Sequence, residues 1–198
     1  MPAAELVKDL AAAKAAAAKI GYPVVLKAQS PALPHKTEAG GVRLNLKTAD
    51  EVRAAYAQIV ANVRRHAPAA RISGVIVQAI VRDGLEMVVG LHRDAVHGTI
   101  VMAGVGGIHV EVLKDVAFRA VPITPAEAAA MLDELKSSRM LDGVRGAPPV
   151  NRAALAELIS RVSLFGAAAG ERFAELDLNP VRVNAREAVA VDWLMVCR

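Results

Sequence analysis

Hydrophobic and polar residues alternate in the last quarter of the chain, where leucines separate Glu175, Asp177 and Asn179. Because successive side chains of a strand point to opposite faces, this alternation predicts a β-strand with its polar side chains on one face. Pro180 ends the run, and residues 189–195 predict a neighbouring strand that carries one acid, Asp192. Oxygen-bearing side chains are costly to bury and attract a hard cation such as Mg²⁺. Asp177, Asn179 and Asp192 therefore form a candidate magnesium site; the alternative is a solvated strand face.

Apolar runs bounded by turn residues predict the other strands. The runs at residues 73–80 and 85–92 are separated by Val-Arg-Asp-Gly, which predicts a β-hairpin. Further strands are expected at residues 23–29, 42–46 and 98–103.

Helices are expected where composition or start signals favour them. Residues 4–20 are Ala-rich and stop at Gly21. Two capping boxes, Thr48 with Glu51 and Thr124 with Glu127, predict helices that end near residues 65 and 135. A fourth helix is expected at residues 152–169.

Strand-rich and helix-rich stretches follow one another, but without the regular alternation of strand and helix that is typical of a doubly wound sheet. This order predicts the fold class α+β with largely antiparallel sheets. A boundary between two lobes is expected near residues 68–73 or 119–124.

Composition excludes several classes of protein. With 198 residues, 54% hydrophobic and 22% charged, the chain is long enough for a buried core and is not of a disordered type. It contains no apolar run of membrane-spanning length and no secretory leader pattern, so a cytoplasmic location is expected. The net charge of +4 is scattered and aromatic residues make up 3%, which argues against a nucleic-acid stacking platform. The single cysteine, Cys197, allows no internal disulfide and is read as incidental.

Two further features suggest phosphate chemistry. Lys27 ends an apolar run, so a desolvated ammonium there would need an anionic partner; the alternative is a lysine that reaches water. Gly104, Gly106 and Gly107 would allow the backbone to approach a phosphate closely, although an ordinary tight turn would use the same residues. The pattern lacks the Gly-Lys-Ser/Thr of a Walker loop and does not open a helix as a dinucleotide fingerprint does.

Taken in order, five segments resemble the ATP-grasp domain of the ADP-forming (NDP-forming) acyl-CoA synthetases, which are related to the succinyl-CoA synthetase β chain. The resemblance extends from about Pro2 to the C-terminus, so residues 1–198 are expected to form one nucleotide-binding domain. It implies a two-lobed ATP-grasp fold that holds ATP or ADP with Mg²⁺ between antiparallel sheets. The segments are residues 21–27, 35–42, 104–111, 114–119 and 175–181 with 190–192.

The resemblance also implies roles for individual residues. Lys27 would contact the phosphates, and His35 in its polar loop would be a phosphate carrier, with a purely structural loop histidine as the alternative. Arg119 would neutralise phosphoryl charge or, alternatively, form a surface ion pair. Glu111 is implied as a catalytic candidate, and Glu86 would lie near the nucleotide. A hinge whose backbone reads adenine would be formed by Gln78, Ala79 and Ile80. The implied metal ligands are Asn179, Asp192 and Asp177. The histidines at 66, 92, 97 and 109 are read as structural or solvated.

The family reaction converts acyl-CoA, ADP and phosphate into a carboxylic acid, CoA and ATP through a phosphohistidine. The CoA-binding part and the main phosphohistidine domain have no counterpart in this sequence. The chain is therefore expected to be a nucleotide-binding subunit or an excised part of an acid–CoA ligase (ADP-forming), with a CoA-binding partner. One alternative is a sensory domain, as in the synthetase-like part of some protein lysine acetyltransferases. Another is a nonenzymatic scaffold.

Overall fold

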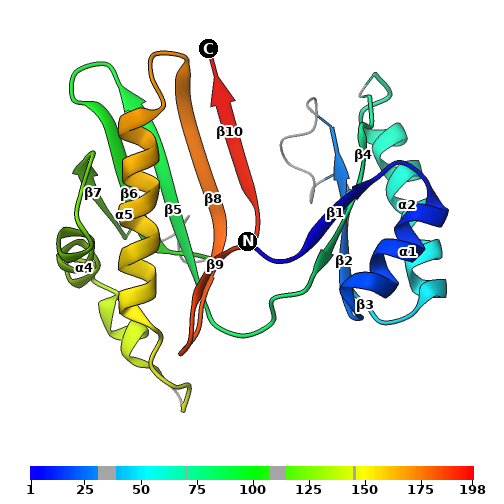
Figure 1. The fold of residues 1–198 in the computed structure, drawn as a ribbon, viewed down its shortest axis with the longest axis horizontal. Coiled ribbons are helices and arrows are strands. Elements are labelled where there is room, and N and C mark those ends of the chain that lie inside the picture. The colour runs from blue at the N-terminus through cyan, green and yellow to red at the C-terminus, as the bar shows by residue number, and fades with distance from the viewer. Residues whose placement is uncertain (31–38, 70, 108–114, 145) are drawn as a thin grey trace. The chain divides into compact units, whose positions relative to one another are not determined.

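The computed structural model describes residues 1–30, 39–69, 71–107, 115–144 and 146–198. It divides into two compact units, Pro2–Val81 and Arg82–Arg198, and Met1 belongs with the second unit. The division lies at residues 81 and 82, so the predicted boundaries near residues 68–73 and 119–124 are wrong. Each unit contains one sheet with helices packed against it (Figure 1).

The first unit is a four-stranded antiparallel sheet in the order β1-β4-β2-β3. Helix α1 packs on β1 and β4, and helix α2 packs on β2 and β3, so one face of the sheet is covered. The core lies between the helices and this face, where Val24, Leu26 and Ala28 alternate inward. The element bounds are β1 Ala4–Val7, α1 Leu10–Ile20, β2 Val24–Gln29, β3 Val42–Leu46, α2 Ala49–His66 and β4 Gly74–Ala79.

The predicted helix over residues 4–20 is wrong in its first third. Ala4–Val7 forms the edge strand β1, paired with β4, and the helix begins only at Leu10. Asp9 is the N-cap of α1: its backbone is extended rather than helical, and its carboxylate accepts the Ala12 N–H at 2.8 Å. Pairing with a distant strand therefore outweighs the alanine content of this segment.

The second unit is a six-stranded antiparallel sheet in the order β10-β8-β5-β6-β7, with β9 also paired to β8. Helix α4 packs on β6 and β7, and helix α5 packs on β5, β6 and β9. The element bounds are β5 Leu85–Asp94, β6 Gly98–Val105, β7 Val116–Ala120, α4 Pro125–Asp133, the 3₁₀ helix η1 Ser138–Asp142, α5 Arg152–Ala168, β8 Phe173–Val183, β9 Ala188–Ala190 and β10 Trp193–Cys197.

Capping chemistry fixes the starts of the predicted helices. At α4 the Thr124 hydroxyl accepts the Glu127 N–H at 3.2 Å, and the Glu127 carboxylate accepts the Thr124 N–H at 2.7 Å, so this capping box is complete. At α2 only half of the box forms: Thr48 caps Glu51, whereas the Glu51 carboxylate accepts from Lys47. Both helices begin where the sequence predicts.

The predicted hairpin between residues 73–80 and 85–92 is wrong. Strand β4 is paired on its two sides with β1 and β2, and β5 is paired with β6 and β8. Each strand thus has its hydrogen-bonding edges satisfied in a different sheet, and residues 81–84 connect the units. The fold class is confirmed, because helices pack on two sheets whose strand pairs are all antiparallel in the part of the chain that the structure describes. None of the helices in these ranges has the length and hydropathy to cross a membrane.

Candidate functional site

The face of the second sheet opposite α5 carries the polar column predicted on β8. Glu175, Asp177 and Asn179 line one cavity of about 370 Å³, which confirms that they share a face. Strands β5, β6 and β7 supply the rest of its wall: Val88, Gly90, His92, Ile100, Met102 and Phe118 line it, together with Leu91 and Leu176. An acidic column thus borders a largely apolar floor.

Asp177 is the electrostatic centre of this column. Burial raises the pKa of its carboxyl group, and the negative charges of Glu175 and Asp192 raise it further. A hydrogen bond with the Asn179 side chain acts in the opposite direction. Ionising the Asp177 carboxyl group in the folded chain therefore costs free energy, and a bound cation would reduce this cost.

Backbone hydrogen bonds bring Asp192 beside this column. The Asn179 N–H donates to the Asp192 carbonyl oxygen at 3.2 Å, and the Val191 N–H donates to the Pro180 carbonyl oxygen at 2.9 Å. The Trp193 N–H also donates to the Asp192 carboxylate at 3.0 Å, which orients that side chain. The predicted single strand over residues 189–195 is wrong, because β9 ends at Ala190 and β10 begins at Trp193. Asp192 lies in the break, opposite Asn179.

The donor set suits a small hard cation. Among the residues that the structure describes, no group of three or more His, Cys, Asp or Glu side chains is placed to hold a metal. An ion here would instead use two carboxylates and one amide, from Asp177, Asp192 and Asn179, with other oxygens completing its shell. Mg²⁺ is typically bound in this way, by a few protein oxygens together with water and phosphate.

Glu86 and the glycine turn meet where β5 begins and β6 ends. The Gly106 N–H donates to the Glu86 carbonyl oxygen at 2.6 Å, and a side chain at Gly106 would begin only 3.0–3.2 Å from Glu86 atoms. The Glu86 carboxylate is bound by Arg182 at 2.6 Å, and Arg182 also donates to the Gly84 carbonyl at 3.1 Å. Glu86 therefore belongs to a local hydrogen-bond network and does not simply face water. Gly107, the next residue of the turn, has a positive φ of 74°.

At Gly104, strand packing explains why the residue is glycine. It lies within β6, and a Cβ atom there would come within 2.7 Å of the Asp115 carbonyl oxygen and 2.8 Å of a Val116 methyl group. Close packing of β7 against β6 accounts for this residue without a phosphate. Only Gly106 and Gly107 lie in the turn that follows the strand.

In the first unit, Lys27 and Gln78 share the sheet face opposite the helices. Lys27 is directly opposite Ile76, and Val25 is opposite Gln78, which places these four residues on one face. Lys27 is only 6% exposed and Gln78 only 3%, although both are polar. The predicted desolvation of Lys27 is therefore confirmed. A buried ammonium group requires hydrogen-bonding or anionic partners.

A model of the ATP-grasp domain matches residues 1–197. The chain belongs to the ATP-grasp family. Its match to the β subunit of acetate–CoA ligase [ADP-forming] I from Pyrococcus furiosus is 44% identical over 178 residues, 90% of this chain and 76% of that protein. Acetate–CoA ligase [ADP-forming] I from Archaeoglobus fulgidus is 44% identical over 191 residues, 96% of this chain but 28% of that protein. This ATP-grasp chain thus corresponds to the β subunit, or the β-subunit part, of such ligases.

A solved structure supports the same assignment. The dinucleotide-forming acetyl-coenzyme A synthetase 1 of Ca. Korarchaeum cryptofilum, in complex with coenzyme A, Ca-AMPCP and HgCl⁺, has a TM-score of 0.97 and 39% identity. The match covers 100% of this chain and 86% of that chain. The chain spans only 28% of the length of the A. fulgidus ligase.

Arg119 of the ATP-grasp domain points away from the acidic column. It lies opposite Val101, whose side chain is in the core beneath the helices, whereas its neighbour Phe118 lines the cavity on the other face. Arg119 forms an ion pair with Glu134 at the end of α4, and this contact raises the pKa of the guanidinium. The structure therefore favours the surface ion pair over the phosphate clamp.

Of the predicted hinge residues, Ala79 is the last residue of β4 and Ile80 follows it, just before the division at residues 81 and 82. The Ala79 N–H donates to the Ala3 carbonyl oxygen at 2.8 Å, so this donor is already used within the first sheet. Adenine recognition through Ala79 would have to use its carbonyl group. Two other candidates, His35 and Glu111, lie outside the residues that the structure describes.

Sequence reasoning missed the non-acidic wall of the cavity. His92 lies opposite Glu175 across the β5–β8 pair, and Met102 and Phe118 extend the wall over β6 and β7. The period-two pattern of each strand determines which of its own residues share a face, but only the order β8-β5-β6-β7 brings these three residues to one wall with β8.

Proposed function

We propose that this chain is the nucleotide-binding part of an ADP-forming acyl-CoA synthetase, which binds ATP or ADP with Mg²⁺ and exchanges phosphate with a histidine. The observation that carries the proposal is the arrangement of Asp177, Asn179 and Asp192 beside an apolar floor on the open face of the second sheet. A related structure, of the K. cryptofilum enzyme, contains Mg-AMPPCP, which supports both the nucleotide and the metal.

In this proposal the two carboxylates and the amide hold the ion, and the apolar wall excludes water around the bound nucleotide. When bound, Mg²⁺ would neutralise phosphate charge during transfer. A bound cation would favour the ionised Asp177 carboxylate and so counteract the burial and the neighbouring charges that raise its pKa. In the other unit, Lys27 is the candidate for a phosphate contact, since an anion would offset the cost of burying its ammonium group.

The partner in this proposal is a CoA-binding subunit or domain that also carries the main phosphohistidine. His35 is the proposed carrier on this chain, and Glu111 remains a catalytic candidate. The isolated chain is expected to bind nucleotide and accept phosphate but to form no acyl-CoA. Acyl-CoA formation by the chain alone would contradict this division of the reaction.

The proposal is tested by incubating the chain with γ-labelled ATP and Mg²⁺ and measuring acid-labile, alkali-stable phosphate on the protein. Label is expected on the wild type and on Glu171→Gln, a matched loss of charge at an exposed position of the same unit. Asp192→Ala should abolish it, and His35→Asn should abolish it if His35 is the carrier. Nucleotide binding without any labelling would overturn the transfer step and favour a sensory domain.

A further inference from the structure

Another cavity, of about 880 Å³, lies within the first unit, at the end where α2 finishes and β4 begins (Figure 1). Its walls come from three segments: the link between β1 and α1, the second half of α2, and the residues that lead into β4. None of the residues that line it is among those predicted from the sequence to bind nucleotide or metal.

Three positively charged side chains line this cavity, one from each segment. Lys8 comes from the link before α1, Arg64 from the last turn of α2, and Arg71 from the link before β4. Among the residues that the structure describes, no acidic side chain lines the cavity, and none of the three cations forms an ion pair with a carboxylate. Because like charges repel one another, their convergence on one cavity favours a bound anion.

The sequence around α2 explains why no acid balances this charge. No Asp or Glu occurs between Glu51 and Asp83, whereas arginines occur at positions 53, 64, 65, 71 and 82. Asp9 follows Lys8, but its carboxylate caps α1 by accepting the Ala12 N–H, and it is not among the lining residues. The cavity is therefore positive in composition as well as in arrangement.

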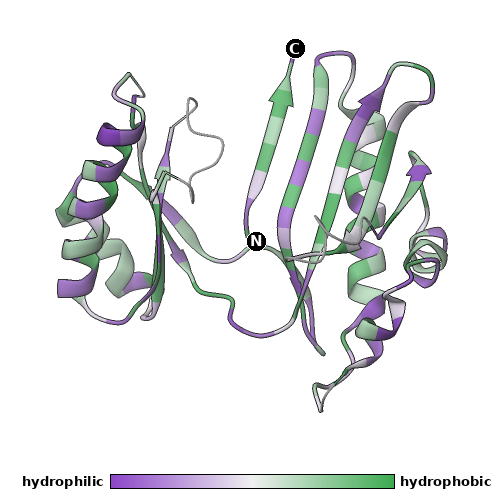
Figure 2. Ribbon diagram, turned by 180° about the vertical axis from the view of Figure 1, so that it is seen from behind, coloured by the Kyte–Doolittle hydropathy of each residue, from purple (hydrophilic) through white to green (hydrophobic). Residues whose placement is uncertain are grey.

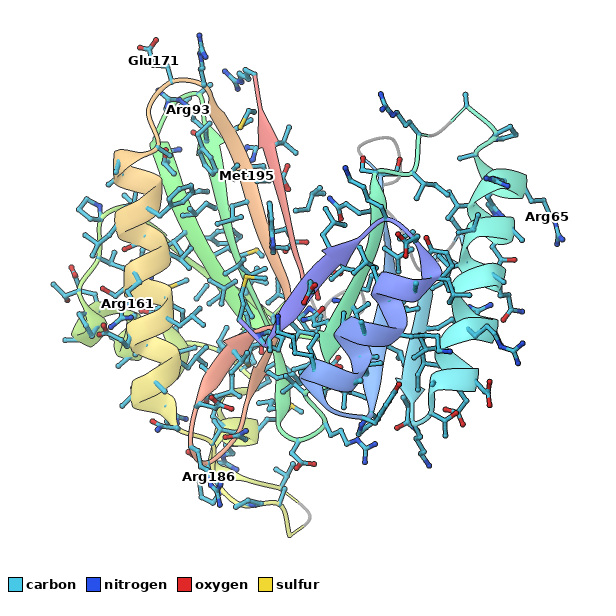
Figure 3. All side chains as sticks on the ribbon, turned by 45° about the vertical axis from the view of Figure 1, so that its right-hand side comes forward. Arg65, Arg93, Arg161, Glu171, Arg186 and Met195 are labelled. Carbon is cyan, nitrogen blue, oxygen red and sulfur yellow. The ribbon has the colours of Figure 1, made fainter. Side chains whose placement is uncertain are left out.

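Stabilisation of α2 accounts for only part of this arrangement. Basic side chains near the carboxyl end of a helix interact favourably with its dipole, and Arg64, Arg65 and His66 all lie in the last turn of α2. Figure 2 shows this end of α2 in the colour of hydrophilic residues, and Figure 3 shows Arg65 projecting outward from α2, away from the sheet of its unit. Lys8 and Arg71 belong to other segments, so the helix dipole does not explain why three cations converge.

The rest of the wall supplies a hydroxyl group and an apolar surface. The Ser73 hydroxyl lines the cavity and can donate a hydrogen bond to an anion. Val60 and Ile72 contribute apolar side chains, and Tyr56 contributes its ring. The Tyr56 hydroxyl donates to the Lys8 carbonyl oxygen at 3.1 Å, which fixes the link before α1 against α2. Cations beside an apolar wall suit an anionic molecule that also has an organic part.

The kind of anion follows from the arginines and from the size of the cavity. Arginine binds a phosphate group through two parallel hydrogen bonds, whereas lysine adds a point charge. A volume of about 880 Å³ is within the range of small-molecule sites and exceeds what a single phosphate group would fill.

We propose that this cavity binds a phosphorylated small molecule with an uncharged organic part. Its phosphate group lies between Lys8, Arg64 and Arg71, and its organic part lies against Val60 and Ile72. This site shares no residue with the candidate magnesium–nucleotide site, so the two sites can be tested separately.

Calorimetric titration with phenyl phosphate tests the site, in EDTA and about 0.15 M KCl, which screens unspecific attraction to surface charges. Phenyl phosphate should bind, and inorganic phosphate should bind about fivefold more weakly, because it has no ring to place against the apolar wall. Phenol, which has the ring without the charge, should show no measurable binding. Absence of phenyl phosphate binding, or equal affinity for phenyl phosphate and inorganic phosphate, would overturn the proposal.

Arg64 and Arg65 provide a matched pair of variants, because both are exposed in the last turn of α2 but only Arg64 lines the cavity. Arg64→Gln and Arg71→Gln should each weaken phenyl phosphate binding by about tenfold or more, since each removes hydrogen bonds to a charged group. Arg64→Lys should recover only part of the loss, because lysine lacks the planar fork. Arg65→Gln should bind as the wild type does. Equal weakening by Arg64→Gln and Arg65→Gln would show unspecific attraction to a basic surface and contradict a built site.

Chemical protection locates the bound phosphate directly. Phenylglyoxal modifies accessible arginine side chains, and peptide mass spectrometry measures the rate at each position. Phenyl phosphate should slow the modification of Arg64 and Arg71 and leave that of Arg65 unchanged. Protection at other arginines, with Arg64 and Arg71 modified at their original rates, would assign the phosphate to a different site and refute the proposal. Circular dichroism and melting temperature check that the variants are folded.

Discussion

The backbone N–H of Asn179 donates to the backbone carbonyl of Asp192 at 3.2 Å, although the two residues belong to different segments of the sheet. This bond joins the middle of β8 to the break between β9 and β10. It sets an amide and a carboxylate beside Asp177, whose pKa responds to the charge of Asp192. The metal-binding hypothesis depends on this junction rather than on either strand alone.

Asp177 is expected to make the stability of the metal-free chain depend on pH. Because its pKa is raised in the folded state, the folded chain binds the proton more tightly than the unfolded chain does. Its contribution is therefore favourable below the ordinary aspartate pKa and is lost as the pH rises through the raised value. Asp177→Asn should raise the melting temperature at pH 7 without Mg²⁺, by up to about 3 °C, and this gain should vanish near pH 3.5.

The measurement is a series of thermal melts of wild type and Asp177→Asn between pH 3.5 and pH 7, in EDTA and in Mg²⁺ with AMPPCP. With the metal nucleotide present the order should reverse, because the variant loses a ligand. A variant that is less stable than wild type at pH 7 in EDTA would contradict the raised pKa.

Gly104→Ala should destabilise the second unit. The new methyl group would lie within 2.8 Å of Asp115 and Val116 atoms, and overpacking of this kind costs about 1–3 kcal/mol. Gly90→Ala in β5 is the matched change, since its Cβ would meet its nearest neighbours only at 3.4–3.5 Å. Urea unfolding of both variants measures the difference, and equal free energies of unfolding would remove the packing explanation for Gly104.

Arg182→Met is expected to cost about 1.5–3 kcal/mol of stability, because hydrogen bonds to a charged group are lost. Arg182 binds both the Glu86 carboxylate at 2.6 Å and the Gly84 carbonyl at 3.1 Å. A double-mutant cycle with Glu86→Gln, followed by urea unfolding, should give a coupling energy of at least about 0.5 kcal/mol. Strictly additive effects would show that the two side chains do not stabilise each other.

Arg119→Gln tests the reassignment of this residue to an ion pair. Its partner Glu134 is half-exposed, so the loss should cost less than about 1 kcal/mol in urea unfolding. The affinity for Mg-AMPPCP should stay within about twofold of wild type, because Arg119 lies on the helix-covered face. A tenfold loss of nucleotide affinity would restore the phosphate clamp.

Much of the fold follows from local signals in the sequence. The capping boxes at Thr48 and Thr124 placed two helices, and the apolar runs placed β2, β3 and β6, because these signals act over a few residues. The features of the fold that the sequence did not predict depend on strand pairing between residues far apart in the chain. β1 is a strand only because β4 is available to it, and β4 and β5 are no hairpin because each has other partners.

The candidate site divides in the same way. Alternation along β8 was sufficient to place Glu175, Asp177 and Asn179 on one face. The face of Arg119 required the register of β7 against β6, and the packing role of Gly104 required the same pair of strands. Neither relationship is encoded by residues close in sequence.

The most direct test of the central claim is calorimetric titration of the chain with AMPPCP, with and without Mg²⁺. Binding is expected in Mg²⁺ and should be strongly weakened in EDTA, by Asp192→Ala and by Asn179→Ala, while Glu171→Gln binds as the wild type does. Affinity that is the same in EDTA, or that is unchanged in both Asp192→Ala and Asn179→Ala, would contradict a metal–nucleotide site built on these residues.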